Sequence, residues 1–138
     1  MKRKKIGSMH VLKKGKKNCL LNVGAILKNV MKASEMLSKH KINHSVYDLR
    51  KIKPLIKKDL IFILKRYSKV FVIEEHYENG GVYSYILEET NKIKKINTKI
   101  YSIAVKNKFI KFCGNQESAL KITGLDPKSI FKRIKKEI

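Results

Sequence analysis

Apolar residues fall in short blocks, and two kinds of block alternate along the chain. One kind is a run of consecutive apolar residues of strand length, as at residues 19–23, 46–49, 70–73 and 100–105. The other places apolar residues three or four positions apart with lysines between them, which is typical of a helix with one buried face. This alternation predicts an α/β fold of three layers, α/β/α, with a mostly parallel (mixed) sheet of about five strands.

The helices are predicted between the strands and after the last one. Their inward-facing residues are Ile26, Val30, Ala33 and Leu37, then Leu60, Ile61, Leu64 and Tyr67, then Val82 and Ile86. Asn115 and Gly124 are of the residue types that cap the two ends of a helix, so they predict a short fourth helix between them. Asp126 followed by Pro127 predicts the start of a last helix.

The chain length of 138 residues fits one hydrophobic core. Residues 1–16 are basic and weakly patterned, apart from a short strand suggested by Val11-Leu12, so we expect a lead-in at 1–16 and a domain at 17–138. No apolar run approaches the ~20 residues that cross a bilayer, and no signal-peptide stretch follows the basic start. We expect a cytoplasmic protein that does not contact a membrane.

Positive charge dominates the composition. Lys and Arg number 33 against 11 Asp and Glu, for a formal net charge of +22. Such a field attracts phosphates, so a basic nucleic-acid-binding module is the alternative function of another class. Arginine, which reads bases through its fork, stands only at positions 3, 50, 66 and 133, and the lysines are spread along the whole chain. We therefore expect weak, salt-sensitive binding and no specific nucleic-acid partner.

Glu74, Glu75 and His76 follow a predicted strand, where open α/β sheets bind ligands. They could form an acid/base cluster, or one carboxylate could cap loop amides while the others face water. The second interpretation is favoured, with Glu75 as an acceptor for loop amides, because no nucleophile or metal triad accompanies them.

Gly80 and Gly81 precede a predicted helix. They could hold an anion on free backbone amides, or form a tight turn that lets the helix start close to the sheet. The pair is neither a GxGxxG motif nor a phosphate-binding loop, so the turn is favoured.

Other reactive side chains show no pattern of a site. Cys19 and Cys113 are far apart, outside any CxxC motif, and are interpreted as two ordinary thiols in a reducing cytoplasm. The histidines at positions 10, 40 and 44 do not have the spacing of metal ligands. The context of a nucleophile elbow is missing at three serines: Ser8, Ser84 and Ser118.

Four segments, taken together and in order, resemble the C-terminal domain of transketolases. Residues 46–55 look like the family's "VxDLRxIKPL" segment and include Asp48, Arg50, Lys53 and Pro54. Residues 70–76 are similar to its strand ending in "EEH", and Gly80-Gly81 falls on its glycine pair. The last segment follows the pattern "F…G…GLD" with Phe109, Gly114 and Gly124-Leu125-Asp126. Residues 19–37 fit its opening strand, glycine and helix, so the resemblance spans roughly residues 6–138.

The resemblance implies a structural role within a larger enzyme. Family members hold thiamine diphosphate and Mg²⁺ between an N-terminal and a middle domain, and the "GDG…N" motif of that site has no counterpart here. No catalytic, cofactor-binding or metal residue is therefore carried over. We expect an inactive isolated domain, excised or from a split enzyme, that supports the middle domain and the dimer of an enzyme for ketol transfer between sugar phosphates.

The subfamily is less defined by these motifs. "DLR…KP" is shared with the β subunit of 2-oxoacid dehydrogenases and with deoxyxylulose-phosphate synthase, while "EEH" favours the transketolase branch. The chain departs from the family pattern at Tyr83 and Tyr85, where small residues are usual, and at Lys108, where an acidic residue is usual.

Overall fold

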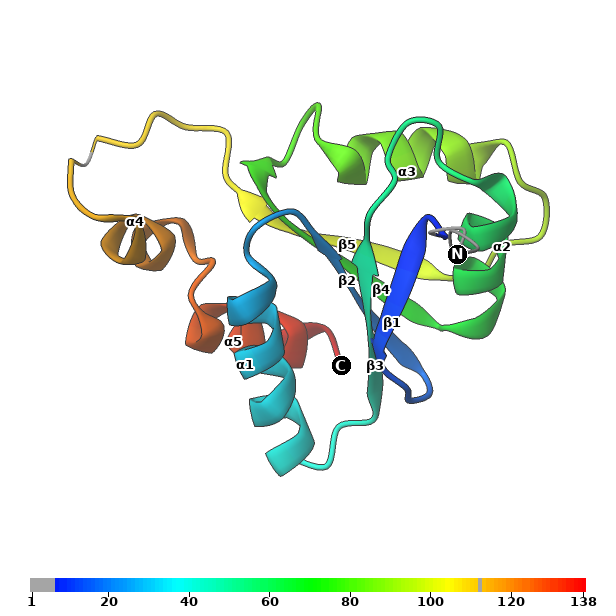
Figure 1. Cartoon of the computed structure of the whole chain (residues 1–138), viewed down its shortest axis with the longest axis horizontal. Coiled ribbons are helices and arrows are strands. Elements are labelled where there is room, and N and C mark those ends of the chain that lie inside the picture. Colours follow the sequence, from blue (N-terminus) through cyan, green and yellow to red (C-terminus); the bar gives the residue numbers. More distant parts are fainter. Residues whose placement is uncertain (1–6, 112) are drawn as a thin grey trace, which may run out of the picture.

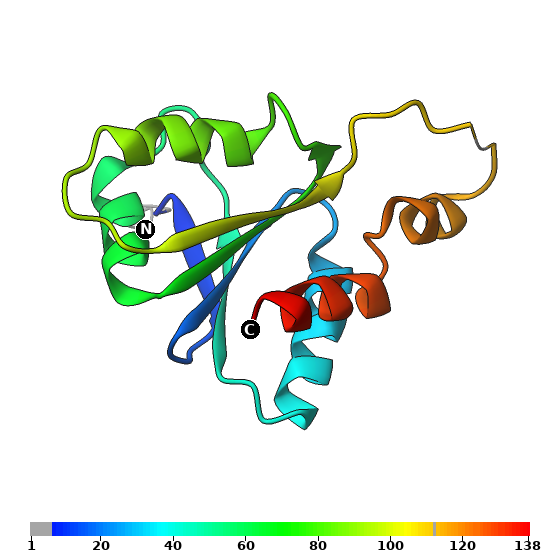
Figure 2. The ribbon, with the colours of Figure 1, turned by 180° about the vertical axis from the view of Figure 1, so that it is seen from behind.

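Strands β2 (Asn18–Val23) and β4 (Lys69–Tyr77) form the centre of the sheet and pair in parallel. All of β2 and the stretch of β4 from Val70 to Glu74 are buried, because these apolar runs are covered on both faces. The computed structural model describes residues 7–111 and 113–138. Figures 1 and 2 show the sheet between helices, as the sequence predicts.

The five strands lie in the order β1-β3-β2-β4-β5. Strands β3 (His44–Leu49) and β5 (Lys99–Val105) continue the parallel arrangement on either side, and β1 (Met9–Lys13) pairs antiparallel with β3. From β2 the chain crosses to β3 on one side and then to β4 on the other. The carboxyl ends of β2 and β4 therefore flank the switch point at which open α/β sheets bind ligands.

Two helices cover each face of the sheet. Helices α1 (Leu27–Lys39) and α5 (Pro127–Glu137) pack on the face that carries Leu20 and Phe71. Helices α2 (Lys57–Arg66) and α3 (Val82–Asn91) pack on the face that carries Leu21 and Val72. Helix α4 (Gln116–Thr123) has no buried residue and lies to one side of the sheet in both views.

The predicted helix ends in the last third of the chain are confirmed. Asn115 accepts a hydrogen bond from the Ser118 amide over 2.9 Å, and Gly124 ends α4 with a φ of 75°. Asp126 accepts from the Ser129 amide over 3.3 Å and precedes Pro127 at the start of α5. These short-range signals work because a cap depends on neighbours within one turn.

Two segments differ from the prediction. Strand β1 lies within the stretch expected to be a lead-in, so the sheet includes residues 9–13, before the expected domain boundary at residue 17. Residues 1–6 of that lead-in lie outside the described residues. Strand β4 continues to Tyr77, so Glu74, Glu75 and His76 belong to its end instead of following it. The cause is tertiary: Tyr77 pairs with Val105 of β5 beyond an irregularity that begins after Ile73.

A buried histidine links β1, α1 and β3. His44 is 1% exposed, its Nδ1 lies 2.8 Å from the Ile42 carbonyl oxygen, and its Nε2 lies 2.6 Å from Ser34 Oγ and 3.1 Å from Lys13 Nζ. The Ile42 carbonyl oxygen can only accept, so Nδ1 carries the hydrogen. The Lys13 ammonium can only donate, so Nε2 is the acceptor of a neutral ring. Burial lowers the pKa of His44, and the Lys13 charge lowers it further, although the hydrogen bond to Ile42 opposes both.

We predict that stability falls as the pH drops below about 6.5, the ordinary pKa of histidine. The folded-state pKa of His44 is lowered, so below that pH the unfolded chain binds more protons than the folded chain and unfolding is favoured. The urea midpoint, measured between pH 7.5 and 5.5, should shift less in His44→Asn than in the unmodified chain. His10→Asn, at an exposed position of β1, is the control and should keep the full shift. An unchanged shift in His44→Asn would contradict this account.

Candidate functional site

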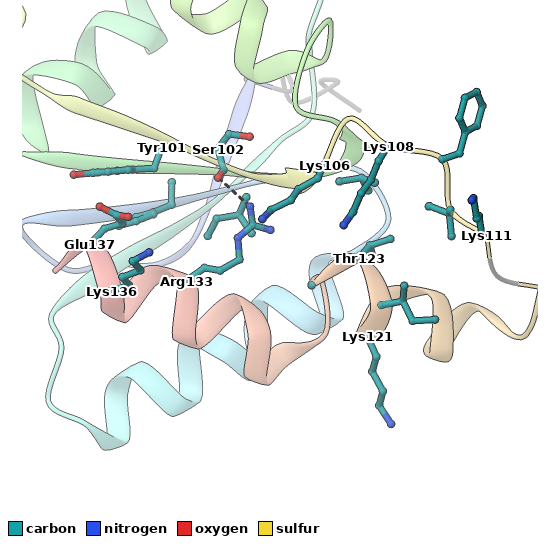
Figure 3. A pocket seen from close by; sticks show the side chains of 17 residues that line it. Tyr101, Ser102, Lys106, Lys108, Lys111, Lys121, Thr123, Arg133, Lys136 and Glu137 are labelled. Atoms are coloured by element: carbon teal, nitrogen blue, oxygen red, sulfur yellow. Dashed lines mark hydrogen bonds between the residues drawn. The ribbon is translucent and has the colours of Figure 1, made fainter.

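A cavity of about 550 Å³ lies between β5, α5 and the residues that follow β5 (Figure 3). Arg133 reaches its wall and donates hydrogen bonds to the carbonyl oxygens of Ser102 and Ala104, over 3.4 and 3.1 Å. Of the residues predicted as site or motif residues, Gly124 and Phe109 line this cavity, as does Phe71 of the motif strand at residues 70–76. The predicted cluster at the end of β4, Glu74 to His76, lies elsewhere.

A cavity of about 330 Å³ brings Glu74 and His76 of that cluster together with a distant motif. Glu75 lines another cavity, of about 390 Å³. Lys53, from the connection between β3 and α2, lines the cavity of about 330 Å³ with Glu74, His76, Gly80 and Gly81. Ile52 comes from the same connection as Lys53, and the other lining residues come from α3: Val82, Ser84, Tyr85 and Glu88. This cavity is the candidate site, because it lies at the carboxyl edge of the sheet and joins two motifs that are about twenty residues apart.

Glu74 is the buried carboxylate of the site and caps α3. It is 2% exposed; its Oε2 accepts from the Val82 amide over 2.9 Å, and its Oε1 accepts from the Tyr83 amide over 3.0 Å. The first amides of a helix lack partners within the helix, and the helix dipole favours a negative charge beside them. One carboxylate therefore caps loop amides, as the favoured interpretation has it.

The prediction that Glu75 accepts from loop amides is wrong. Glu75 and His76 are exposed, and Glu74 makes both of these hydrogen bonds. Side chains alternate between the two faces of a strand, so extending β4 to Tyr77 puts Glu74 on the α3 face, together with Val72, and turns Glu75 away from it.

The glycine pair lets α3 start against Glu74. Gly80 has a φ of 82°, in the left-handed region that favours glycine, and its amide donates to Ser84 Oγ over 3.0 Å. Gly81 has an extended backbone, and a Cβ added to it would lie 2.6 Å from Glu74 Oε1. The amides of Val82 and Tyr83 thus already donate to the protein's own carboxylate. At these two positions, no free donor remains for the bound anion that the sequence offered as an alternative.

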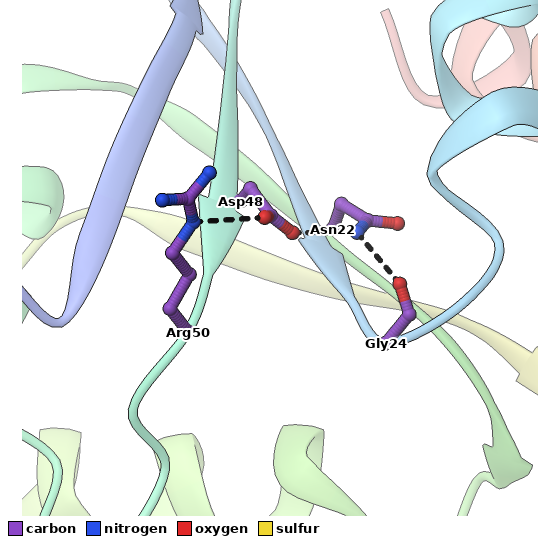
Figure 4. A network of polar contacts seen from close by, with 4 residues as sticks. All are labelled: Asn22, Gly24, Asp48 and Arg50. Carbon is purple, nitrogen blue, oxygen red and sulfur yellow. Dashed lines mark hydrogen bonds and ion pairs between the residues drawn. The ribbon is translucent and has the colours of Figure 1, made fainter.

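A second polar network joins the ends of β2 and β3 (Figure 4). Asn22 Nδ2 donates to Asp48 Oδ1 over 2.8 Å and to the Gly24 carbonyl oxygen over 3.1 Å, and Arg50 Nε donates to Asp48 Oδ2 over 3.3 Å. Asp48 and Arg50 of the "DLR" motif thus pair with each other. Sequence analysis missed Asn22, which is fully buried. Its signal was a polar residue inside the apolar run at 19–23.

Residues 7–130 match the family model described as "Transketolase, C-terminal domain". The chain belongs to the transketolase family, as a C-terminal domain of it. A solved structure described as a split gene transketolase, inactive beta4 tetramer, has the same fold: the TM-score is 0.81 at 23% identity, over 93% of this chain and 41% of that one.

Curated relatives of this transketolase C-terminal domain carry the name 1-deoxy-D-xylulose-5-phosphate synthase. The protein from Fusobacterium nucleatum is 32% identical over 133 residues, which cover 96% of this chain and 22% of the relative. The protein from Caldanaerobacter subterraneus is 34% identical over 125 residues, covering 91% and 20%. The chain thus spans about a fifth of the length of these relatives.

The remaining motif positions of this transketolase C-terminal domain do not converge on one point. Lys53 places its ammonium 5.9 Å from the centre of the Tyr85 ring, and Pro54 lies in the connection before α2. Gly114 is exposed before α4, and Gly124 ends that helix. Tyr85, one of the expected departures from the family pattern, lines the candidate cavity.

The described part of the chain shows no grouping of ligands for a metal. Within residues 7–111 and 113–138, no three His, Cys, Asp or Glu side chains come close enough to hold an ion. In the same residues, no helix is long and apolar enough to cross a membrane.

We predict that Gly81→Val lowers the free energy of unfolding by about 1–3 kcal/mol, the range for a strained or overpacked backbone site. The reason is the approach of the new Cβ to the capping carboxylate of Glu74, at 2.6 Å. Urea unfolding measures the change. Gly7→Val is the control, because a Cβ there meets only the Met9 carbonyl oxygen, at 3.6 Å, an ordinary contact. Equal midpoints for the two variants would remove the role assigned to this turn.

Proposed function

We propose that the chain is the structural C-terminal domain of a thiamine-diphosphate-dependent enzyme, supports the middle domain and the dimer, and contributes no catalytic residue. The observation that carries this proposal is the use of Glu74. The buried acid at the carboxyl edge of the sheet is engaged by the Val82 and Tyr83 amides, so this carboxylate holds α3 in place. What remains for a partner is the surface of the domain.

The reaction of the complete enzyme is either ketol transfer between sugar phosphates or synthesis of 1-deoxy-D-xylulose 5-phosphate. The "EEH" motif favours the first, and the names of the curated relatives favour the second. We propose the synthase branch, because identities of 32% and 34% extend over nearly the whole chain. The β subunit of a 2-oxoacid dehydrogenase is the remaining alternative.

We propose that thiamine diphosphate and Mg²⁺ are bound by the upstream domains alone. The residues of the candidate cavity do not fit a diphosphate, because the amides at the start of α3 already hold a carboxylate that would repel one. The absence of a specific nucleic-acid partner stays a prediction. It is supported by the arginines of the described chain, of which Arg50 and Arg133 form intramolecular hydrogen bonds and Arg66 lies near aromatic rings.

We predict that this chain stabilises and activates an upstream partner. The partner is the F. nucleatum relative without its matching 133-residue segment, produced as a separate chain. Analytical ultracentrifugation and a synthase assay should show more dimer and more activity after this chain is added, because it limits the motion of the domains that hold the cofactor. Equal dimer and equal activity without this chain would refute the scaffold role.

Calorimetry gives the control for the cofactor. With thiamine diphosphate and Mg²⁺, the isolated chain should give no saturable heat, and the complex should give one. Micromolar binding by the isolated chain would show that the cofactor site lies partly in this domain.

A further inference from the structure

Exposed apolar side chains gather at the end of β4 and around the segment that follows β5. Tyr77 is 41% exposed, Phe109 93%, Ile110 42% and Ile122 57%. We call these four residues the apolar patch. In a chain with a net charge of +22, large apolar groups concentrated in water mark a surface that a partner covers.

The patch is continuous across two cavities. The cavity of about 550 Å³ is lined by Phe109, Ile110 and Ile122, and a second one of about 390 Å³ by Tyr77 and Ile110. The two cavities share Ile110 as well as Val105 and Thr123, so the surface is hollowed on both sides of Ile110. Helix α4, which carries Ile122, buries none of its residues in the domain. A partner surface with convex parts can therefore enter both cavities, on either side of Ile110.

Lysines flank the patch around the larger cavity, and Glu75 lines the smaller one. Lys106, Lys108, Lys111 and Lys121 are exposed and line the larger cavity, in which the only carboxylate side chain among the described lining residues is Glu137. Figure 3 shows Lys106 and Lys108 pointing into the same space between β5 and α4. The complementary surface is apolar at its centre and acidic at its rim.

This charge disfavours a second copy of the chain as the occupant, since two identical basic rims would repel each other. Pairing of two β5 edges is also blocked, because Arg133 occupies the outward carbonyl oxygens of Ser102 and Ala104. A lipid surface would attract lysines and Phe109, but it is flat and would leave the two cavities unfilled. A folded protein surface can cover the apolar side chains, fill the two cavities and pair with the lysines at the same time.

We propose that the apolar patch is the docking surface for the upstream portion of the enzyme, which presents an apolar centre rimmed by carboxylates. The inference rests on the proposed function and names the face that performs it. Its support is threefold: the exposure of Phe109, the charge of the rim and the coverage of only about a fifth of each curated relative. Phe109 is the most exposed of the four side chains and is the proposed anchor, since aromatic side chains carry much of the energy of such interfaces.

Binding of the truncated F. nucleatum relative to variants of this chain tests the proposal, with affinities measured by biolayer interferometry. Phe109→Ala and Ile122→Ala should each weaken binding about tenfold or more, in the range of interface anchors. Phe62→Ala is the matched control, because Phe62 is 51% exposed on α2, far from the patch in sequence, and it should bind as the unmodified chain does. Both phenylalanines are exposed, so neither change removes core packing.

A charge reversal tests the rim. Lys108→Glu should weaken binding more than Lys58→Glu, an exposed position at the start of α2, and the difference should shrink at high salt. The result that overturns the patch but leaves the proposed function is binding by the unmodified chain that Phe109→Ala, Ile122→Ala and Lys108→Glu all retain. The result that overturns both is no binding by the unmodified chain.

The other occupants are separated by two further measurements. Sedimentation of the chain alone should show a monomer. A dimer that is lost in Phe109→Ala would overturn the proposal, because the occupant of the patch would then be a second copy of the chain. Vesicles of anionic phospholipid should bind the unmodified chain and Phe109→Ala equally. Vesicle binding that depends on Phe109, together with upstream binding that does not, would overturn the proposal in favour of a membrane.

Discussion

The burial of β2 and β4 on both faces is the constraint from which the arrangement of this domain follows. Apolar runs without alternation can be covered only by helices on each side, so the chain must cross between faces as it adds strands. Parallel strands joined by helices place all their carboxyl ends at one edge. That edge collects the "DLR" network, the end of β4 and the glycine turn, although these segments are distant in sequence.

At this edge, a buried negative charge stabilises the fold by capping α3. A carboxylate buried without partners would be costly, and Glu74 is stable there because two amides of α3 point at it. The same pair of amides could have held a substrate anion. Since the protein supplies its own anion and Gly81 leaves no room for a side chain beside it, the start of α3 is a structural joint. This use of Glu74 supports the assembly role that we propose for the domain.

Sequence patterns predicted those parts of the structure that depend on near neighbours. The caps at Asn115 and Asp126 and the apolar runs of β2 and β4 required no knowledge of the fold. The length of β4 depended on its pairing with β5, which no local pattern records, and the capping role was therefore expected at Glu75 instead of Glu74. Phe109 matched a family motif, but only the structure showed that its ring faces water.

Hydrogen–deuterium exchange of the chain, with and without the upstream portion of the F. nucleatum relative, tests most directly that this domain acts through a docking face at its carboxyl edge. The account predicts slower exchange on complex formation in residues 77–81, 106–111 and 116–123. Residues 57–66 of α2 should be unchanged. Protection confined to α2 or to β1, or no protection anywhere in the presence of a saturating partner, would contradict the account.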